Sequence, residues 1–181
     1  MKTLVIVIHP NMEKSRINRR WVEELQKYPD QITVNLLFQE YPDEKIDIRR
    51  EQRLLLEHDR VVFQFPFYWY SGPYLLQKWE EEVLAFGWAY GPGGAKLHGK
   101  ELVLAVSTGG AETAYRGEGY NNFTMSELLR PFQNLASLTG LKYLSPFIFH
   151  GAKAASDEEI EQSAPRYVKH ILSLQLEYLP Q

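Results

Sequence analysis

The sequence predicts a single α/β domain over residues 1–181, a three-layer sandwich with helices on both faces of a five-stranded parallel sheet. Stretches of strand length alternate with stretches of helical periodicity, which is typical of sheets built from strand–helix–strand units. The first strand is apolar throughout, as expected of a strand buried on both faces. The second strand alternates apolar and polar residues, so we expect it at a sheet edge. These features fit the strand order 2-1-3-4-5.

The first half of the chain supplies three of the strands. Residues 4–8 read Leu-Val-Ile-Val-Ile and form the first strand, and residues 32–36 form the alternating edge strand. Between them, Ser15 is the expected N-cap of a helix whose apolar residues recur every four positions from Ile17 to Leu25. Asp47 is placed to cap the next helix, which leads to a third strand at residues 61–63.

The second half continues the alternation. Pro73 suits the first position of a helix, since proline lacks an N–H that would need a partner there. Residues 102–106 form the fourth strand and residues 147–149 the fifth. Two capping boxes predict further helices, and two prolines inside those helices are expected to kink or shorten them: Thr124 with Glu127, Ser156 with Glu159, Pro131 and Pro165.

The composition excludes several classes of function. The chain has no cysteine, which rules out disulfides, thiolate metal sites and a cysteine nucleophile. Its net charge is −3, so a basic surface for nucleic acid is not expected. No two of the five histidines have metal-ligand spacing, and we expect no metal site. The acidic run at residues 80–82 is interpreted as a solvated helix face. The chain reads as a cytoplasmic protein without a signal peptide.

The segment after the first strand has features of an anion site. It runs from His9 through Ser15 and Arg16 to Asn18, and it leads into a helix N-terminus. Free backbone N–H groups and the helix dipole favour an anion such as phosphate there. Ser15 offers a hydroxyl and Arg16 a charged pair of donors. The simpler alternative is that Ser15 only caps the helix.

The segment after the third strand contains four consecutive aromatic residues, Phe67, Tyr68, Trp69 and Tyr70. Connecting loops are commonly polar and exposed, so this run is unusual. The aromatic side chains are suited to lining a planar ring system. A hydrophobic plug beneath a helix, or a contact between subunits, remains the alternative.

The segment after the fourth strand begins Ser107-Thr108-Gly109-Gly110. Paired glycines let a backbone approach a ligand closely, although a plain tight turn gives the same pair. In a sheet of the predicted order, these three segments meet at the carboxyl ends of the strands, where ligands bind. An anion site, an aromatic wall and a glycine turn together are what flavin mononucleotide (FMN) requires.

These residues resemble the flavodoxin-like NAD(P)H:quinone oxidoreductases, the DT-diaphorase-like family. The resemblance is closest to the ancillary flavoproteins of bacterial glutathione-gated potassium efflux systems and to related general stress proteins, and it covers nearly the whole chain. The motifs that carry it are His9-Pro10, Ser15 to Asn18, Tyr41-Pro42-Asp43, Glu51-Gln52, Gln64 to Pro73, His98-Gly99-Lys100 and Ser107 to Gly110.

The resemblance implies a flavodoxin-like fold and a homodimer with one flavin per subunit, FMN or alternatively FAD. It implies ping-pong hydride transfer from NADPH or NADH to the flavin and then to a quinone. Tyr115 matches a tyrosine that hydrogen-bonds the flavin. The family's flavin contacts fall on His9, Ser15, Arg16, Ile17, Asn18, Phe67, Tyr68, Trp69, Tyr70, Ser107, Thr108, Gly109 and Gly110.

One position departs from the pattern of the mammalian-type enzymes. Those enzymes carry a histidine six positions after this tyrosine, where this chain has Asn121. A Tyr–His proton relay is therefore in doubt, whereas the hydride chemistry belongs to the flavin.

Two further functions remain open. One is a regulatory flavoprotein that docks on a potassium efflux channel at the inner face of the membrane. The other is an electron-transfer flavodoxin, which a net charge of only −3 disfavours.

Overall fold

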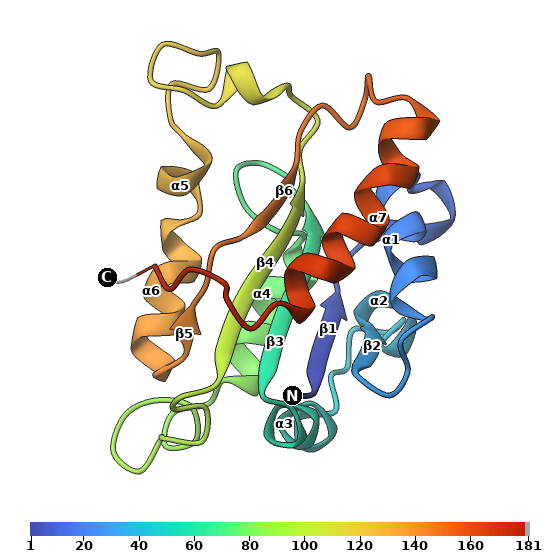
Figure 1. Cartoon of the computed structure of the whole chain (residues 1–181). Helices are drawn as coiled ribbons and strands as arrows, with labels where there is room; N and C mark the ends of the chain where they lie inside the picture. The colour runs from blue at the N-terminus through green and yellow to red at the C-terminus, as the bar shows by residue number, and fades with distance from the viewer. Residues whose placement is uncertain (180–181) are drawn as a thin grey trace.

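The structure is a computed structural model that describes residues 1–179 and contains the expected alternation of strands and helices (Figure 1). The strands form a parallel sheet in the order β2-β1-β3-β4-β5, and a further short strand, β6, also pairs with β4. The predicted fold class and strand order are confirmed. The strands are β1 (Thr3–Val7), β2 (Ile32–Leu36), β3 (Arg60–Pro66), β4 (Glu101–Ser107), β5 (Lys142–Tyr143) and β6 (Phe147–Phe149).

The outer edge beside β4 consists of two short strands where the sequence predicts one. Tyr143 of β5 pairs with Leu102, and Phe147 of β6 pairs with Ala105. This edge therefore advances four residues while β4 advances three, and the ladder is interrupted. Pro146 lies in the interruption and has no N–H to donate. A two-residue strand such as β5 carries no periodicity that a sequence could display.

The helices follow the predicted caps. Both capping boxes are formed, by Thr124 with Glu127 and by Ser156 with Glu159. Among the described residues, none of the helices combines the length and the apolar character that crossing a bilayer requires. The helices are α1 (Ile17–Leu25), α2 (Leu37–Glu40), α3 (Ile48–Glu57), α4 (Tyr74–Val83), α5 (Met125–Leu128), α6 (Arg130–Thr139) and α7 (Asp157–Leu172), with short 3-10 turns η1 (Met12–Lys14) and η2 (Glu112–Ala114).

The two prolines behave differently. Pro131 occupies the first turn of α6, and the helix is interrupted at Leu129, between α5 and α6. The predicted interruption is therefore confirmed. Pro165 lies inside α7, which continues to Leu172. Pro165 therefore does not shorten its helix. The extensive burial of α7 against the sheet outweighs the loss of one helical hydrogen bond.

Helices cover both faces of the sheet and form two apolar layers. Helices α1 and α7 cover one face, and α3, α4, α5 and α6 cover the other (Figure 1). Alternate residues of β1 enter different layers: Leu4 and Ile6 point to one, Val5 and Val7 to the other. This explains the continuous apolar sequence of β1. The mixed burial of β2 agrees with its place at the edge.

A buried carboxylate joins three elements on the α3 and α4 side. Glu51 is fully buried and accepts hydrogen bonds from Asn35 of β2 at 2.9 Å, the Tyr41 hydroxyl at 2.8 Å and the Trp79 indole of α4 at 2.8 Å. Arg50 completes the set with an ion pair at 2.6 Å. Burial and the neighbouring Glu51 raise the pKa of Tyr41 to about 12, so the phenol stays a donor.

We predict that Glu51→Gln lowers the free energy of unfolding by about 3 kcal/mol, because the new amide N–H₂ group faces buried donors that then lack an acceptor. Urea unfolding of wild type and variant measures this loss. The control is Glu57→Gln, an exposed position on the same helix, which is expected to change stability by less than about 0.5 kcal/mol. A loss below about 1 kcal/mol for Glu51→Gln would contradict the role of this carboxylate.

Candidate functional site

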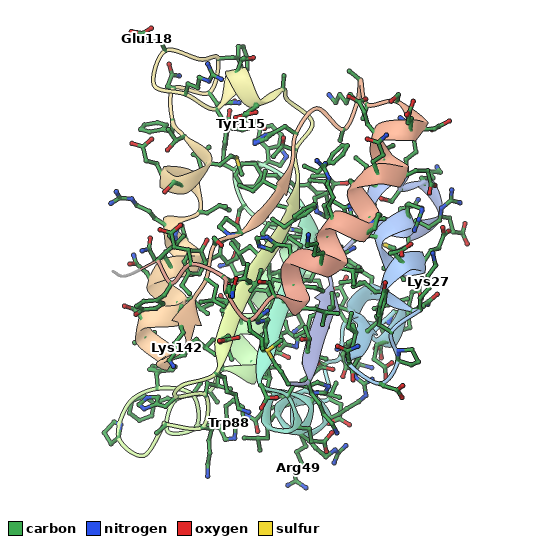
Figure 2. The ribbon with its side chains drawn as sticks, viewed as in Figure 1. Lys27, Arg49, Trp88, Tyr115, Glu118 and Lys142 are labelled. Atoms are coloured by element: carbon green, nitrogen blue, oxygen red, sulfur yellow. The ribbon has the colours of Figure 1, made fainter. Side chains whose placement is uncertain are left out.

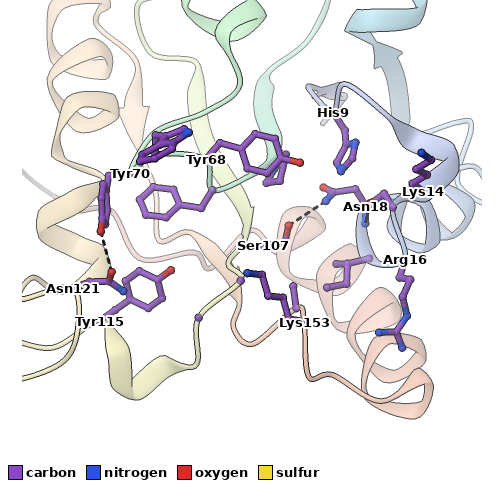
Figure 3. Close-up of a pocket in the computed structure, with 18 residues that line it drawn as sticks. His9, Lys14, Arg16, Asn18, Tyr68, Tyr70, Ser107, Tyr115, Asn121 and Lys153 are labelled. Carbon is purple, nitrogen blue, oxygen red and sulfur yellow. Dashed lines mark hydrogen bonds between the residues drawn. The ribbon is translucent and has the colours of Figure 1, made fainter.

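The carboxyl ends of β1, β3 and β4 meet at a cavity of about 850 Å³ (Figure 3). Val7 pairs with Gln64 and Pro66 pairs with Ser107, so the loops that follow these strands start side by side. The volume lies within the range of small-molecule sites, roughly 300–1,000 Å³. Most of the predicted site residues line this cavity: His9, Ser15, Arg16, Ile17, Asn18, Phe67, Tyr68, Trp69, Tyr70, Ser107, Gly109, Gly110 and Tyr115.

One end of the cavity is the start of α1. Ser15 Oγ accepts a hydrogen bond from the backbone N–H of Asn18 at 3.1 Å, so Ser15 does act as a cap. The Asn18 side chain donates to Ser107 Oγ at 3.1 Å, and Gln64 donates to the Asn18 carbonyl at 3.2 Å. These bonds fix α1 to the ends of β3 and β4. The first amides of the helix have no acceptor within it and favour an anion.

Arg16 lies at the same end, but its guanidinium already has partners. Nη2 donates to the carbonyl of Ala155 at 3.0 Å and to Asp157 Oδ1 at 2.6 Å. Arg16 thereby connects the start of α1 to the segment before α7. Its contact with a bound anion stays a prediction.

His9 supplies a neutral donor beside this end. Its Nδ1 accepts the backbone N–H of Asn11 at 3.1 Å, which leaves the proton of a neutral ring on Nε2. Burial lowers the pKa of His9, so the imidazole is uncharged at neutral pH.

The aromatic segment forms a tight turn with backbone strain. Tyr68 and Ser71 exchange two backbone hydrogen bonds of 2.9 Å, which closes a two-residue turn. The two residues inside it, Trp69 and Tyr70, have φ of 50° and 63°, in the left-handed region that bulky residues avoid. Each such residue costs about 1–3 kcal/mol, and strain of this kind clusters at functional sites. The Trp69 side chain is 94% exposed beside the cavity.

Thr108 is the predicted contact that does not line the cavity. It is fully buried behind the glycine turn, where its Oγ1 donates to the Gly110 carbonyl at 2.9 Å and lies 3.1 Å from His150 Nδ1. A hydroxyl has one hydrogen, so His150 Nδ1 is the donor in the second bond. Burial lowers the pKa of His150, partly opposed by Glu112. Thr108 and His150 therefore hold the turn in shape.

Tyr115 faces the other end of the cavity from the loop after β4. Figure 2 shows Tyr115 on the side of this loop nearer the sheet and Glu118 at its far tip. The phenol oxygen lies 3.4 Å from the position that a Cβ of Gly110 would occupy. Asn121, on the same loop, accepts a hydrogen bond from the Tyr70 hydroxyl at 3.2 Å (Figure 3). The loop thus contacts the aromatic turn across the cavity.

Sequence reasoning missed the two lysines of the site, Lys14 and Lys153. The charged side chains that line the cavity among residues 1–179 are these lysines and Arg16, all cationic. Within the same described part of the chain, neither lysine has a carboxylate at salt-bridge distance, and no three potential metal ligands converge. Lys153 could have been predicted from the sequence, because it lies in the loop after the fifth strand, and this loop is at the same edge of the sheet. The cavity suits an anionic organic ligand.

A family model described as a flavodoxin-like fold matches residues 1–171. The chain belongs to this flavodoxin-like family.

Among curated relatives, the uncharacterized NAD(P)H oxidoreductase YdeQ of Bacillus subtilis is 54% identical over 97% of this chain and 89% of its own length. The glutathione-regulated potassium-efflux system ancillary protein KefG of Cronobacter sakazakii is 40% identical over 92% of this chain and 90% of its own. The sequence resemblance to NAD(P)H oxidoreductases and efflux ancillary proteins is thereby confirmed.

Two solved structures superpose closely on this flavodoxin-like protein. General stress protein 14 of Treponema denticola, in complex with FMN, is 41% identical, with a TM-score of 0.92 over 97% of this chain and all of the other. An NADPH-quinone reductase from P. pentosaceus is 31% identical, with a TM-score of 0.86 over 96% of this chain and 99% of the other.

A second cavity of about 660 Å³ adjoins the first in this flavodoxin-like protein, between α4 and α6, and shares Tyr68 and Trp69 with it. Glu80 of α4 lines it, with Oε1 shielded from solvent and without a hydrogen-bond partner. The interpretation of residues 80–82 as a solvated face is therefore wrong for Glu80. Burial, with a smaller effect of Glu81, raises the pKa of Glu80 to about 7.

This pKa predicts a pH dependence of stability. A carboxyl whose pKa is higher in the folded state than in the unfolded state favours folding while it is protonated. The contribution is complete below about pH 4.5 and is lost as the pH rises to about 7. Relative to Glu80→Gln, wild type is expected to lose about 2 kcal/mol between pH 5 and pH 7.5 in urea unfolding. Glu118→Gln, at an exposed position, is the control. Parallel profiles of wild type and Glu80→Gln would contradict this prediction.

Proposed function

We propose that this chain is a flavin-dependent NAD(P)H:quinone oxidoreductase with FMN as its cofactor. The observation that carries the proposal is the convergence, in one cavity, of a helix N-terminus, a strained aromatic turn and a glycine turn. The names of its relatives, an NAD(P)H oxidoreductase and an NADPH-quinone reductase, support the same activity.

The α1 end of the cavity fits one phosphate group. The free amides at the start of α1, the Ser15 hydroxyl and the Lys14 ammonium are donors of the right kind for a dianion. FMN carries one such group at the end of its ribityl chain. FAD is the alternative, and its second phosphate and adenosine would have to extend beyond this end. The FMN complex of a 41% identical structure favours FMN.

The other end of the cavity fits a planar ring. The strained turn holds Trp69 and Tyr70 in conformations that a free loop would abandon, which keeps the aromatic wall in place for a ligand. When bound, the flavin supplies the hydride chemistry. The chain orients the ring between the aromatic turn and the glycine turn and excludes water from it.

Tyr115 is the residue that we propose to touch the reacting ring. Its hydroxyl lies beside Gly110, at the same end of the cavity as the aromatic turn, and is available to donate. Asn121 is bonded to Tyr70 and has no group that titrates near neutral pH. Tyr115 therefore acts as a hydrogen-bond donor without a proton-relay partner at position 121.

Hydride donor and acceptor would use the same open side of the cavity in turn, which gives a ping-pong scheme with a quinone as acceptor. Exposed aromatic side chains line this opening, among them Trp69 at 94% and Tyr70 at 51%. Aromatic residues are enriched at protein interfaces. A second copy that covers them would complete the acceptor site, and we propose a homodimer.

A second candidate is a regulatory role in the cytoplasm, at the inner face of the membrane. The 40% identity with an ancillary protein of a potassium-efflux system favours it. In that role the flavin would report the redox state to a channel, and quinone turnover would be slow. A gene for such a channel beside the gene for this chain would support the regulatory role.

The proposal predicts that the protein purifies yellow, with about one FMN per chain, and sediments as a dimer. Cofactor identity is measured by mass spectrometry of the released flavin. Steady-state oxidation of NADPH and of NADH with a simple benzoquinone is expected to give parallel double-reciprocal lines, as a ping-pong scheme requires. A colourless protein that takes up neither FMN nor FAD would overturn the proposal. Bound FMN without quinone turnover would favour the regulatory role.

Tyr115→Phe is expected to slow flavin reduction by NADPH about 10-fold, since one hydrogen bond near 1.4 kcal/mol is lost. Stopped-flow absorbance measures the rate. Because burial lowers the pKa of both His9 and His150, the wild-type rate is expected to vary little between pH 7 and 8. Tyr120→Phe, an exposed tyrosine of the same loop outside the cavity, is the control. Equal rates for wild type and Tyr115→Phe would remove Tyr115 from the reaction.

A further inference from the structure

Lys153 lies across the glycine turn. It belongs to the loop between β6 and α7, and its stem passes over Gly109. A Cβ at position 109 would lie 3.4 Å from Lys153 Cε and 3.9 Å from Cδ. These are ordinary van der Waals distances, so the lysine stem lies directly against the backbone of Gly109. The glycine turn is flanked by Lys153 at Gly109 and by the Tyr115 hydroxyl at Gly110.

The backbone that carries Lys153 is tied to the site. The N–H of Gly151 donates to the Gly110 carbonyl and the N–H of Ala152 to the Thr108 carbonyl, both at 2.8 Å. On the other side of the lysine, Arg16 holds the Ala155 carbonyl at 3.0 Å. The place of Lys153 is thus set by hydrogen bonds to the glycine turn and to α1, although its side chain is exposed.

The charge of Lys153 is uncompensated. No carboxylate is among the side chains that line the cavity, and among residues 1–179 none forms a salt bridge with Lys153. The ammonium lies one C–N bond, about 1.5 Å, beyond the Cε that packs over Gly109. Figure 3 shows this amine between Tyr115 and the Arg16 end of the cavity. Lys14, by contrast, ends η1, shortly before α1 begins at Ile17.

We propose that Lys153 stabilises the reduced form of the cofactor, an inference that rests on the FMN-dependent function proposed above. A hydride from NAD(P)H, which becomes NAD(P)⁺, brings one proton and two electrons to a neutral isoalloxazine ring. The ring therefore gains one negative charge. A fixed cation at the glycine turn is placed to stabilise that charge, and it has little to gain from the neutral oxidised ring. Lys14 serves the phosphate, whose charge is the same in both redox states.

The test compares Lys153→Met with Lys14→Met, two substitutions that remove the same charge from two different parts of one cavity. The dissociation constant of oxidised FMN is measured by fluorescence quenching, and the two-electron midpoint potential of bound FMN by dye-coupled titration. Lys153→Met is expected to weaken binding of reduced FMN relative to oxidised FMN about 10-fold, which lowers the potential by about 30 mV. Lys153→Arg is expected to restore the potential.

Lys14→Met is expected to weaken the binding of oxidised FMN without changing the midpoint potential. The Lys14→Met protein is expected to bind riboflavin, which has no phosphate, as tightly as wild type does. An unchanged potential in Lys153→Met would overturn the role of Lys153. A loss of oxidised FMN affinity in Lys153→Met, with riboflavin binding unaffected, would also overturn it, because the ammonium would then serve the phosphate. Failure of the wild-type protein to bind any flavin would overturn the proposed function itself.

Discussion

The parallel register of β1, β3 and β4 is the constraint on which the site depends. Val7 opposite Gln64 and Pro66 opposite Ser107 bring three loops to one edge of the sheet. The same strands are buried on both faces, so a slip by one residue would turn their apolar side chains from one layer into the other. The packing that stabilises the fold therefore also fixes where the three loops begin.

Hydrogen bonds then convert this shared edge into a defined cavity. Asn18 contacts Ser107, Gln64 contacts Asn18, and Tyr70 contacts Asn121, so each loop is hydrogen-bonded to a neighbour. Such fixed surroundings make the left-handed conformations of Trp69 and Tyr70 tolerable. The strain of the aromatic turn is thus supported by the rigid sheet beneath it.

The electrostatics of the cavity depend on which of its cationic side chains form ion pairs. Arg16, the cation that stands out in the sequence beside a helix start, forms an ion pair with Asp157 and ties α1 to the last loop. Within residues 1–179, the cations of the cavity without a salt bridge are Lys14, close to the start of α1, and Lys153, at the glycine turn. Lys14 would stabilise an anionic group at the start of α1, and Lys153 would stabilise a ring that gains negative charge at the glycine turn.

The sequence by itself determined the layer architecture, the strand order and most of the cavity wall. Continuous apolar runs mark strands buried on both faces, and a loop that follows such a strand must lie at the carboxyl edge. The tertiary structure decided three features that short-range patterns do not encode. The outer edge is divided into β5 and β6, Thr108 is buried behind the glycine turn, and the Lys153 side chain packs over Gly109. These features depend on contacts between residues far apart in the sequence, such as Thr108 and His150, 42 positions apart, which no local periodicity records.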